Sequence, residues 1–179
     1  SDNISFGRNK ENSKENAFFK KPSPNQKNTN GRILNEESTK VSFSVQSGFY
    51  KKTQNIKLSC SIDAPIFFTL NGAEPTDNSF LYEEPIQIDS STVLRARIIR
   101  PGYMPDVIGN ASIFINEKNT LNVVSLIVAP KDLWRKRKGI YANFEKRGME
   151  VPAFIEYFDT TKSGAFKLAF SKTTTTRIA

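Results

Sequence analysis

The 179-residue chain contains no histidine and a single cysteine, Cys60. One cysteine excludes an internal disulfide framework, and the lack of histidine and of paired cysteines leaves no ligand set for a metal cluster. Cys60 lies between Leu58 and Ile62 in an alternating apolar pattern. We interpret it as a small buried hydrophobic residue rather than a reactive thiol. The sequence therefore predicts no bound metal and no cofactor.

The chain also lacks a long hydrophobic run. No apolar stretch approaches the ~20 residues needed to span a bilayer, and no secretory signal peptide opens the chain. Its first residues, SDNISFGRNKENSKEN, are instead typical of the interior of a longer protein. We expect a fragment that does not insert into membranes and whose targeting signal lies elsewhere.

Positive charge is in excess, with a formal net charge of +8, but it is concentrated in the flanks. Residues 1–40 hold 8 basic and 5 acidic side chains, residues 41–116 hold 6 and 7, and residues 117–179 hold 12 and 6. The central part is thus nearly neutral. This distribution argues against a nucleic-acid-binding protein, for which a basic surface is expected.

Large apolar residues are scarce in residues 1–40, where Asn, Lys, Ser and Glu dominate. Such a segment cannot bury enough surface to offset the entropy lost on ordering. Pro22 and Pro24 exclude helix and favour an extended path. We predict an extended linker here.

What the chain has instead is apolar alternation with a period of two. It begins at Val41, Phe43 and Val45 and recurs, between turn signals, as far as Ile115. About seven short strands spaced roughly 8–12 residues apart are typical of an antiparallel sandwich. We therefore predict a mainly β protein, with an immunoglobulin-like antiparallel β-sandwich over residues 41–116. An extended N-terminal segment precedes it, and a small additional β-rich segment, residues 117–179, follows it.

The stretch from Phe67 to Pro85 organises this pattern. An apolar run enters Asn71-Gly72, a dipeptide whose residues both tolerate positive φ and therefore favour a tight turn. A second breaker and a polar loop follow before the strand pattern resumes. The predicted structural turn motif comprises Phe68, Thr69, Asn71, Gly72, Pro75, Thr76, Tyr82 and Pro85.

Several side chains in this region have both a functional and a structural interpretation. Thr76 and Ser79 could bind sugar hydroxyls, but hydroxyls that cap a turn are the favoured interpretation. Tyr82 and Tyr103 could stack on a sugar ring, although core packing with the hydroxyl at the edge is favoured.

Acidic residues offer a third possibility, a pair of carboxylates for glycoside hydrolysis. Glu83, Glu84 and Asp63 are the candidates. Adjacent residues of a strand point to opposite faces, so Glu83 and Glu84 should not flank one bond. We predict no catalytic residue in this chain.

Beyond the sandwich, Leu121 to Val128 form a continuous apolar run that predicts a strand buried on both faces. Asp132 is expected to cap a short helical turn that Gly139 ends. The basic residues 135–138 could contact phosphate or an acidic surface, but a solvated turn is favoured. Two further strands are predicted, at 151–159 and 164–170, joined by a turn at 162–164.

One family resemblance covers residues 41–116. The residues that carry it are Gly48-Phe49-Tyr50, Phe68-Thr69-Leu70-Asn71-Gly72, Pro75-Thr76, Ser79, Tyr82, Pro85-Ile86, Thr92-Val93, Ala96 and Gly102. They resemble the chitobiase/β-hexosaminidase C-terminal-type domain, with Asn71 in place of the usual Asp. The resemblance implies an immunoglobulin-like sandwich that accompanies catalytic domains in secreted and surface proteins, without an active site of its own.

Two weaker resemblances flank it. The residues that carry the first, over about 120–171, are Leu121 to Leu126, Asp132-Leu133-Trp134, Gly139-Ile140-Tyr141, Glu150, Pro152, Ile155 to Asp159, Gly164 and Phe166. They are similar to the opening of the CotH-type kinase family, which implies an ATP-dependent protein kinase. The similarity ends before that family's nucleotide site, and the threonine run that follows looks like a terminus or a sequence break. Ser5-Phe6-Gly7-Arg8, Phe18-Phe19 and Pro22-Ser23-Pro24-Asn25 resemble the closing segment of a lamin-tail-type domain.

These patterns favour a non-catalytic accessory or spacer module of a larger secreted or surface bacterial protein. Its expected partners are neighbouring domains of the same polypeptide, with cell-surface polysaccharide as a further candidate. One alternative is a fragment of a CotH-type kinase whose catalytic residues lie beyond this chain. The other is a carbohydrate-binding module, for which Phe49, Tyr50, Tyr82 and Tyr103 would have to form an exposed planar platform.

Overall fold

The computed structural model describes residues 5–8, 16–19, 31–33, 39–146, 148–160 and 165–177. Within these ranges the protein is mainly β, and most strand pairs are antiparallel, consistent with an immunoglobulin-like β-sandwich. The described part contains one helix, the five-residue α1 (Pro130–Trp134). It contains no helix long and apolar enough to cross a membrane. The predicted fold class is confirmed.

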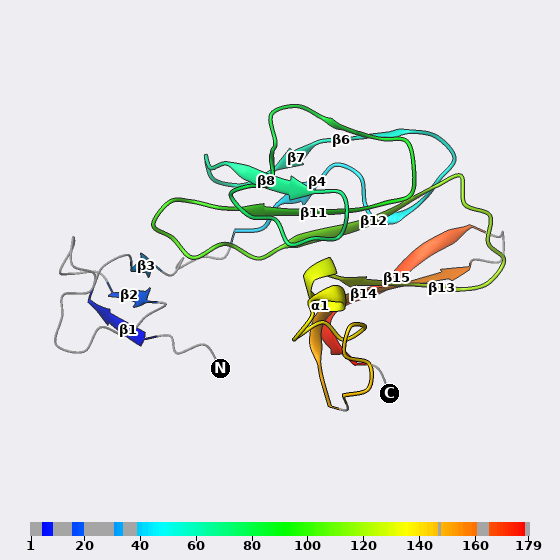
Figure 1. The fold of residues 1–179 in the computed structure, drawn as a ribbon. Helices are drawn as coiled ribbons and strands as arrows, with labels where there is room; N and C mark the ends of the chain where they lie inside the picture. The colour runs from blue at the N-terminus through cyan, green and yellow to red at the C-terminus, as the bar shows by residue number, and fades with distance from the viewer. Residues whose placement is uncertain are drawn as a thin grey trace.

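The larger sheet of the sandwich has five strands (Figure 1). Their order is β5 (Gly48–Tyr50), β12 (Gly109–Ile115), β11 (Thr92–Ile98), β8 (Ile66–Thr69) and β9 (Phe80–Leu81). Two short ladders complete the sandwich, β10 (Ile86–Ile88) with β6 (Gln54–Ile56) and β4 (Ser42–Phe43) with β7 (Leu58–Ser59). Side chains from the sheet and from the ladders form one hydrophobic core, which includes Ile56, Leu58, Leu94, Ile98 and Ile113.

Three details of the predicted sandwich are wrong. The span holds more than the expected seven strands, and β5 pairs with β12 in parallel, with Phe49 opposite Phe114. The pattern Val41-Phe43-Val45 does not form one strand, because β4 ends at Phe43 and the chain bends at Ser44. Ser44 still contacts the neighbouring segment, since its hydroxyl accepts the Lys57 N–H at 2.8 Å and its own N–H donates to the Lys57 carbonyl at 2.9 Å. The chain then crosses to the larger sheet, where it runs beside β12 in the same direction.

The C-terminal sheet is antiparallel and contains β13 (Val123–Val128), β14 (Val151–Thr160) and β15 (Phe166–Thr176). The threonine run belongs to β15, since Thr173 lies opposite Phe154 and Thr176 opposite Val151. The run therefore forms part of the C-terminal sheet. The turn expected at 162–164 lies outside the described residues.

Three expectations for this segment are wrong. The strand β13 is not buried on both faces, because Val124 and Leu126 are 57% and 51% exposed. The cap of α1 is Ala129 rather than Asp132, which lies in the first turn. Pro130 at the start of the helix has a φ already suited to it and needs no capped N–H. The helix ends at Trp134, before Gly139, whose N–H donates to the Arg135 carbonyl at 2.7 Å.

The N-terminal segment holds more structure than an extended linker. Strands β1 (Ser5–Arg8), β2 (Asn16–Phe19) and β3 (Arg32–Ile33) form a small antiparallel sheet (Figure 1). Ala17 and Phe19 are buried in it, and the rings of Phe6 and Phe18 lie 4.9 Å apart. A few apolar side chains on paired strands thus bury one another. The extended path predicted at residues 22–25 lies outside the described residues.

Candidate functional site

The Asn71–Gly72 turn is held by its own side chains. Gly72 has a φ of 74°, in the left-handed region that favours glycine. The Asn71 side-chain oxygen accepts the Ala73 N–H at 3.1 Å, and the Thr69 hydroxyl donates to the Ala73 carbonyl at 2.6 Å. Asn71 also forms a bridge to Val93 on the neighbouring strand. The positive φ and these contacts fix the turn against the larger sheet.

A buried arginine, which sequence reasoning missed, secures the turn from β11. Arg95 is 9% exposed and donates from Nη1 to the Gly72 carbonyl and from Nε to the Asn110 side chain, both at 2.9 Å. Burial lowers the pKa of Arg95, and the charge of Glu74 partly offsets this. The sequence signal for this buried arginine is a charged residue, Arg95, in the middle of the apolar pattern of residues 92–98.

The second half of the motif is also bonded internally. The Thr76 N–H donates to the Ser79 hydroxyl at 2.9 Å, and the Asn78 N–H donates to the Thr76 hydroxyl at 3.3 Å. Pro75 is fully buried. Tyr82 packs against the core, and its N–H donates to the Ile66 carbonyl at 2.8 Å. The two hydroxyls considered as sugar ligands are thus engaged in the loop itself.

The four aromatic residues considered as a platform do not share one exposed face. Phe49 is stacked between Phe114 and Phe166, at 4.5 and 4.0 Å. Tyr50 packs on the core, with its hydroxyl donating to the Gln46 carbonyl at 2.7 Å. Tyr82 also packs on the core, and Tyr103 lies under the Arg100 guanidinium, 4.4 Å from its ring centre. A planar platform of these residues is not formed.

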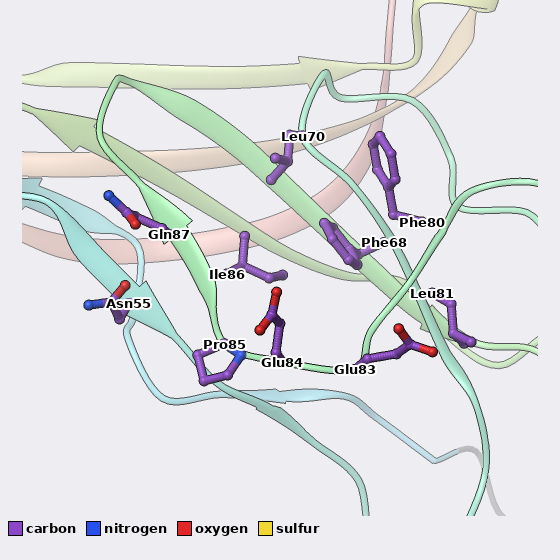
Figure 2. Close-up of a pocket in the computed structure, with 10 residues that line it drawn as sticks. All are labelled: Asn55, Phe68, Leu70, Phe80, Leu81, Glu83, Glu84, Pro85, Ile86 and Gln87. Atoms are coloured by element: carbon purple, nitrogen blue, oxygen red, sulfur yellow. The ribbon is translucent and has the colours of Figure 1, made fainter.

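A groove of about 560 Å³ lies beside the turn, between β9 and β10 (Figure 2). Phe68, Leu70, Phe80 and Ile86 gather on one part of it, and Asn55 and Gln87 lie together on another. Asn55 and Gln87 are register partners on β6 and β10. Pro85 lines the same groove.

Glu83 and Glu84, which were expected on opposite faces of a strand, both line this groove. That expectation assumed that both residues lie in a strand. Residues 82–85 instead form a bend between β9 and β10, where successive side chains do not alternate between two faces. Figure 2 shows the Glu84 carboxylate directed toward Ile86 and Phe68, and the Glu83 carboxylate on the side of Leu81. Asp63 is not among the residues that line it. The groove therefore combines an exposed aromatic ring with amides and carboxylates.

The opposite side of the sandwich contacts the C-terminal sheet. Phe158 of β14 is fully buried and meets the rings of Phe49 and Phe114 edge-on, at 5.5 and 5.6 Å. Glu156, also buried, accepts a hydrogen bond from the Ser47 hydroxyl, and the hydroxyls of Ser112 and Ser125 lie 2.7 Å apart. An aromatic and polar interface thus joins the two units.

The turn stretch reaches this junction as well. Lys131 of α1 forms an ion pair with Glu74, two residues beyond Gly72. Burial alone would raise the pKa of Glu74, but the hydrogen bond and charge of Lys131, with Arg97 and Arg95, outweigh it and lower the pKa below 4.5. The charged side of the turn therefore faces the C-terminal segment.

Comparison with known proteins gives one family match, in the central part of the chain. Residues 45–108 match the family model of the chitobiase/beta-hexosaminidase C-terminal domain. This is an immunoglobulin-like accessory domain family and is generally non-catalytic. No curated protein and no solved structure matches the chain. The match does not extend to the segments that resemble a lamin tail or a CotH kinase. In the described ranges, no group of three or more Asp, Glu, Cys or His side chains could hold a metal ion.

Proposed function

We propose that this chain is a non-catalytic accessory module that holds a neighbouring β-rich unit of the same polypeptide in a fixed orientation. The observation that carries the proposal is the ring cluster between the sandwich and the C-terminal sheet. Four phenylalanines from β5, β12, β14 and β15 meet there. Aromatic rings supply large buried areas and add about 0.5–1.5 kcal/mol per well-placed pair, so such a contact favours one arrangement.

The accessory character of the matched family supports the same role. In this proposal the parent protein is secreted or lies on the bacterial cell surface, and the chitobiase-type sandwich separates a lamin-tail-like segment from a CotH-like one. The partners are then the neighbouring domains on either side. Cell-surface polysaccharide is a further partner, for which the groove provides an observation considered below.

The kinase alternative concerns the longer protein and not these residues. The CotH-like similarity ends before the nucleotide site, so no residue here receives a catalytic role. We expect the purified chain to transfer no phosphate from radiolabelled ATP. Transfer that a point mutant of this chain abolishes would contradict the accessory proposal.

The spacer role is tested by residual dipolar couplings on the full ¹⁵N-labelled chain. We expect one alignment tensor to fit the amides of the sandwich and those of β13–β15, because the ring cluster joins them. Phe49→Ala, which removes the ring at the centre of the cluster, should give two different tensors. Phe80→Ala, an exposed aromatic outside the interface, is the matched control and should keep one tensor. Two tensors in the wild-type chain would refute the proposal.

A further inference from the structure

We propose that the groove between β9 and β10 binds a neutral oligosaccharide, with the Phe80 ring as its stacking face. This inference does not depend on the spacer role, because the groove lies outside the interface with the C-terminal sheet. The proposed site does not use the platform of Phe49, Tyr50, Tyr82 and Tyr103, which is not formed, but a different set of residues.

Phe80 is 67% exposed on a short edge strand, where burial or a polar residue would be expected. Phe68 supports it from one side, with ring centres 5.5 Å apart. Leu70 and Leu81 beside it are 36% and 47% exposed. These exposed apolar side chains all line one groove, which favours an interaction site there. The ring is held in place and presents apolar surface to a ligand.

Space is available around the ring. Phe80 and Leu70 line the groove of about 560 Å³ and also a second hollow of about 260 Å³ beside Asn71, Asn78 and Ser79. Ligand sites typically have volumes of about 300–1,000 Å³. Because Phe80 borders both hollows, a linear chain of sugar rings can extend past it.

The polar lining suits sugar hydroxyls. The Asn55 and Gln87 amides each offer donors and acceptors, and their register places them side by side. The Glu83 and Glu84 carboxylates accept hydrogen bonds from hydroxyl groups. Neither glutamate forms an ion pair within the described part of the chain, and no lysine or arginine is among the residues that line the groove. Two carboxylates without a cation disfavour an acidic sugar, and the amides together with the aromatic ring suit the hydroxyls and apolar faces of a neutral one.

An extended peptide fits this groove less well. Strand addition needs a free edge with several backbone donors and acceptors. Strand β9 has only two residues, and Pro85, directly before β10, has no N–H to offer. The polar groups available here are side chains, which favours recognition of hydroxyls over recognition of a peptide backbone.

Isothermal titration calorimetry on the full chain tests this proposal. The probes are hexasaccharides of β-linked glucose, xylose, mannose and N-acetylglucosamine, with a hexagalacturonate and a lysine-rich decapeptide for comparison. We expect at least one neutral hexasaccharide to bind, and the hexagalacturonate to bind about tenfold more weakly or not at all. Phe80→Ala should weaken the neutral ligand by about tenfold or more, since the ring supplies much of the apolar contact.

The matched control is Phe144→Ala, because Phe144 is also 67% exposed but does not line the groove. It should bind like the wild type. Gln87→Ala gives a second test within the groove and should also weaken binding. Thermal melts of all three variants should match the wild type, since these side chains are exposed. No binding by any neutral probe, unchanged binding by Phe80→Ala, or binding of the decapeptide alone would each overturn the proposal.

Discussion

The sandwich and the C-terminal sheet are both antiparallel β structures, but they bury their apolar residues differently. The sandwich closes on itself, and Leu94, Ile98 and Ile113 are inaccessible to solvent. The three strands of the C-terminal sheet have one covered face, where Phe158 is inaccessible, and another on which Leu126 and Phe170 are more than half exposed. The difference indicates that the sandwich can fold by itself, whereas the C-terminal sheet depends on the sandwich for part of its core.

The largest test of this dependence removes the ring that joins the two units. Phe158→Ala should destabilise the C-terminal sheet by about 3–5 kcal/mol, the range for large aromatic residues deleted from a core. Because Phe158 belongs to the C-terminal sheet, the sandwich should remain folded. Hydrogen exchange would show this as lost protection in β13–β15 and retained protection in β8 and β11.

Phe170→Ala is the matched control, since Phe170 lies on the same sheet, stacks on Tyr157 and is 51% exposed. It should change protection little. Equal loss of protection in both units of Phe158→Ala would show that they unfold together, against the comparison drawn above.

The reverse test removes a core residue of the sandwich. Leu94→Ala should cost about 2–5 kcal/mol, and the C-terminal sheet should unfold together with the sandwich that covers it. Leu126→Ala, a change of the same kind at a half-exposed position of β13, should cost much less. Urea unfolding followed by circular dichroism measures both. A C-terminal sheet that stays folded in Leu94→Ala would contradict its dependence on the sandwich.

The same difference explains what could be predicted from the sequence. Alternating apolar residues and Asn-Gly are local signals, and they were sufficient for the fold class and for the position of the central turn. The apolar run 121–128 was misinterpreted because a run of this kind does not show how many of its faces are covered. Val124 and Leu126 remain exposed since the sandwich covers only one side of the sheet.

The groove was missed for a related reason. Phe80 and Leu81 are adjacent and both exposed, so no period of two marks them. Glu83 and Glu84 were expected on opposite faces, and only the bend between β9 and β10 brings both to one groove. The parallel pairing of β5 depends on where the chain changes sheets, which alternation does not encode. Long-range placement, rather than local preference, decides each of these features.

The next largest loss of stability is expected from a change in the Gly72 turn. This turn belongs to the sandwich and lies close to the junction with the C-terminal segment, where Glu74 pairs with Lys131. An added Cβ at Gly72 would find room, with its nearest contact, the Val128 carbonyl oxygen, at 3.9 Å. The cost of Gly72→Val therefore comes from its positive φ and should be about 1–3 kcal/mol. Thermal unfolding would show this as a lower melting temperature.

Asn71→Asp is the control for the turn, because an aspartate oxygen can accept the same Ala73 N–H. Its melting temperature should match the wild type. An unchanged melt for Gly72→Val would mean that this stretch does not act as a structural turn. If it also lost sugar binding, the stretch would be a ligand site instead.

The smallest expected effect is electrostatic and lies between the two regions. The Glu74–Lys131 pair is partly exposed, with side-chain exposures of 31% and 45%, so we expect about 0.2–1 kcal/mol from it. The pKa of Glu74 is lowered in the folded protein. A lowered carboxyl pKa stabilises the fold above the unfolded value of about 4.5, and this contribution is lost as pH falls through the folded pKa.

Glu74→Gln should therefore lower the unfolding free energy at pH 7 and make no difference at an acidic pH below the folded pKa of the Glu74 carboxyl. Urea unfolding at the two pH values measures the change. Glu84→Gln is the control, since the carboxylate of Glu84 has no ion pair within the described residues, and it should change the unfolding free energy at pH 7 little. A Glu74→Gln effect of equal size at both pH values would show that the side chain acts by packing. The junction would then rest on its aromatic rings and hydroxyl contacts rather than on charge.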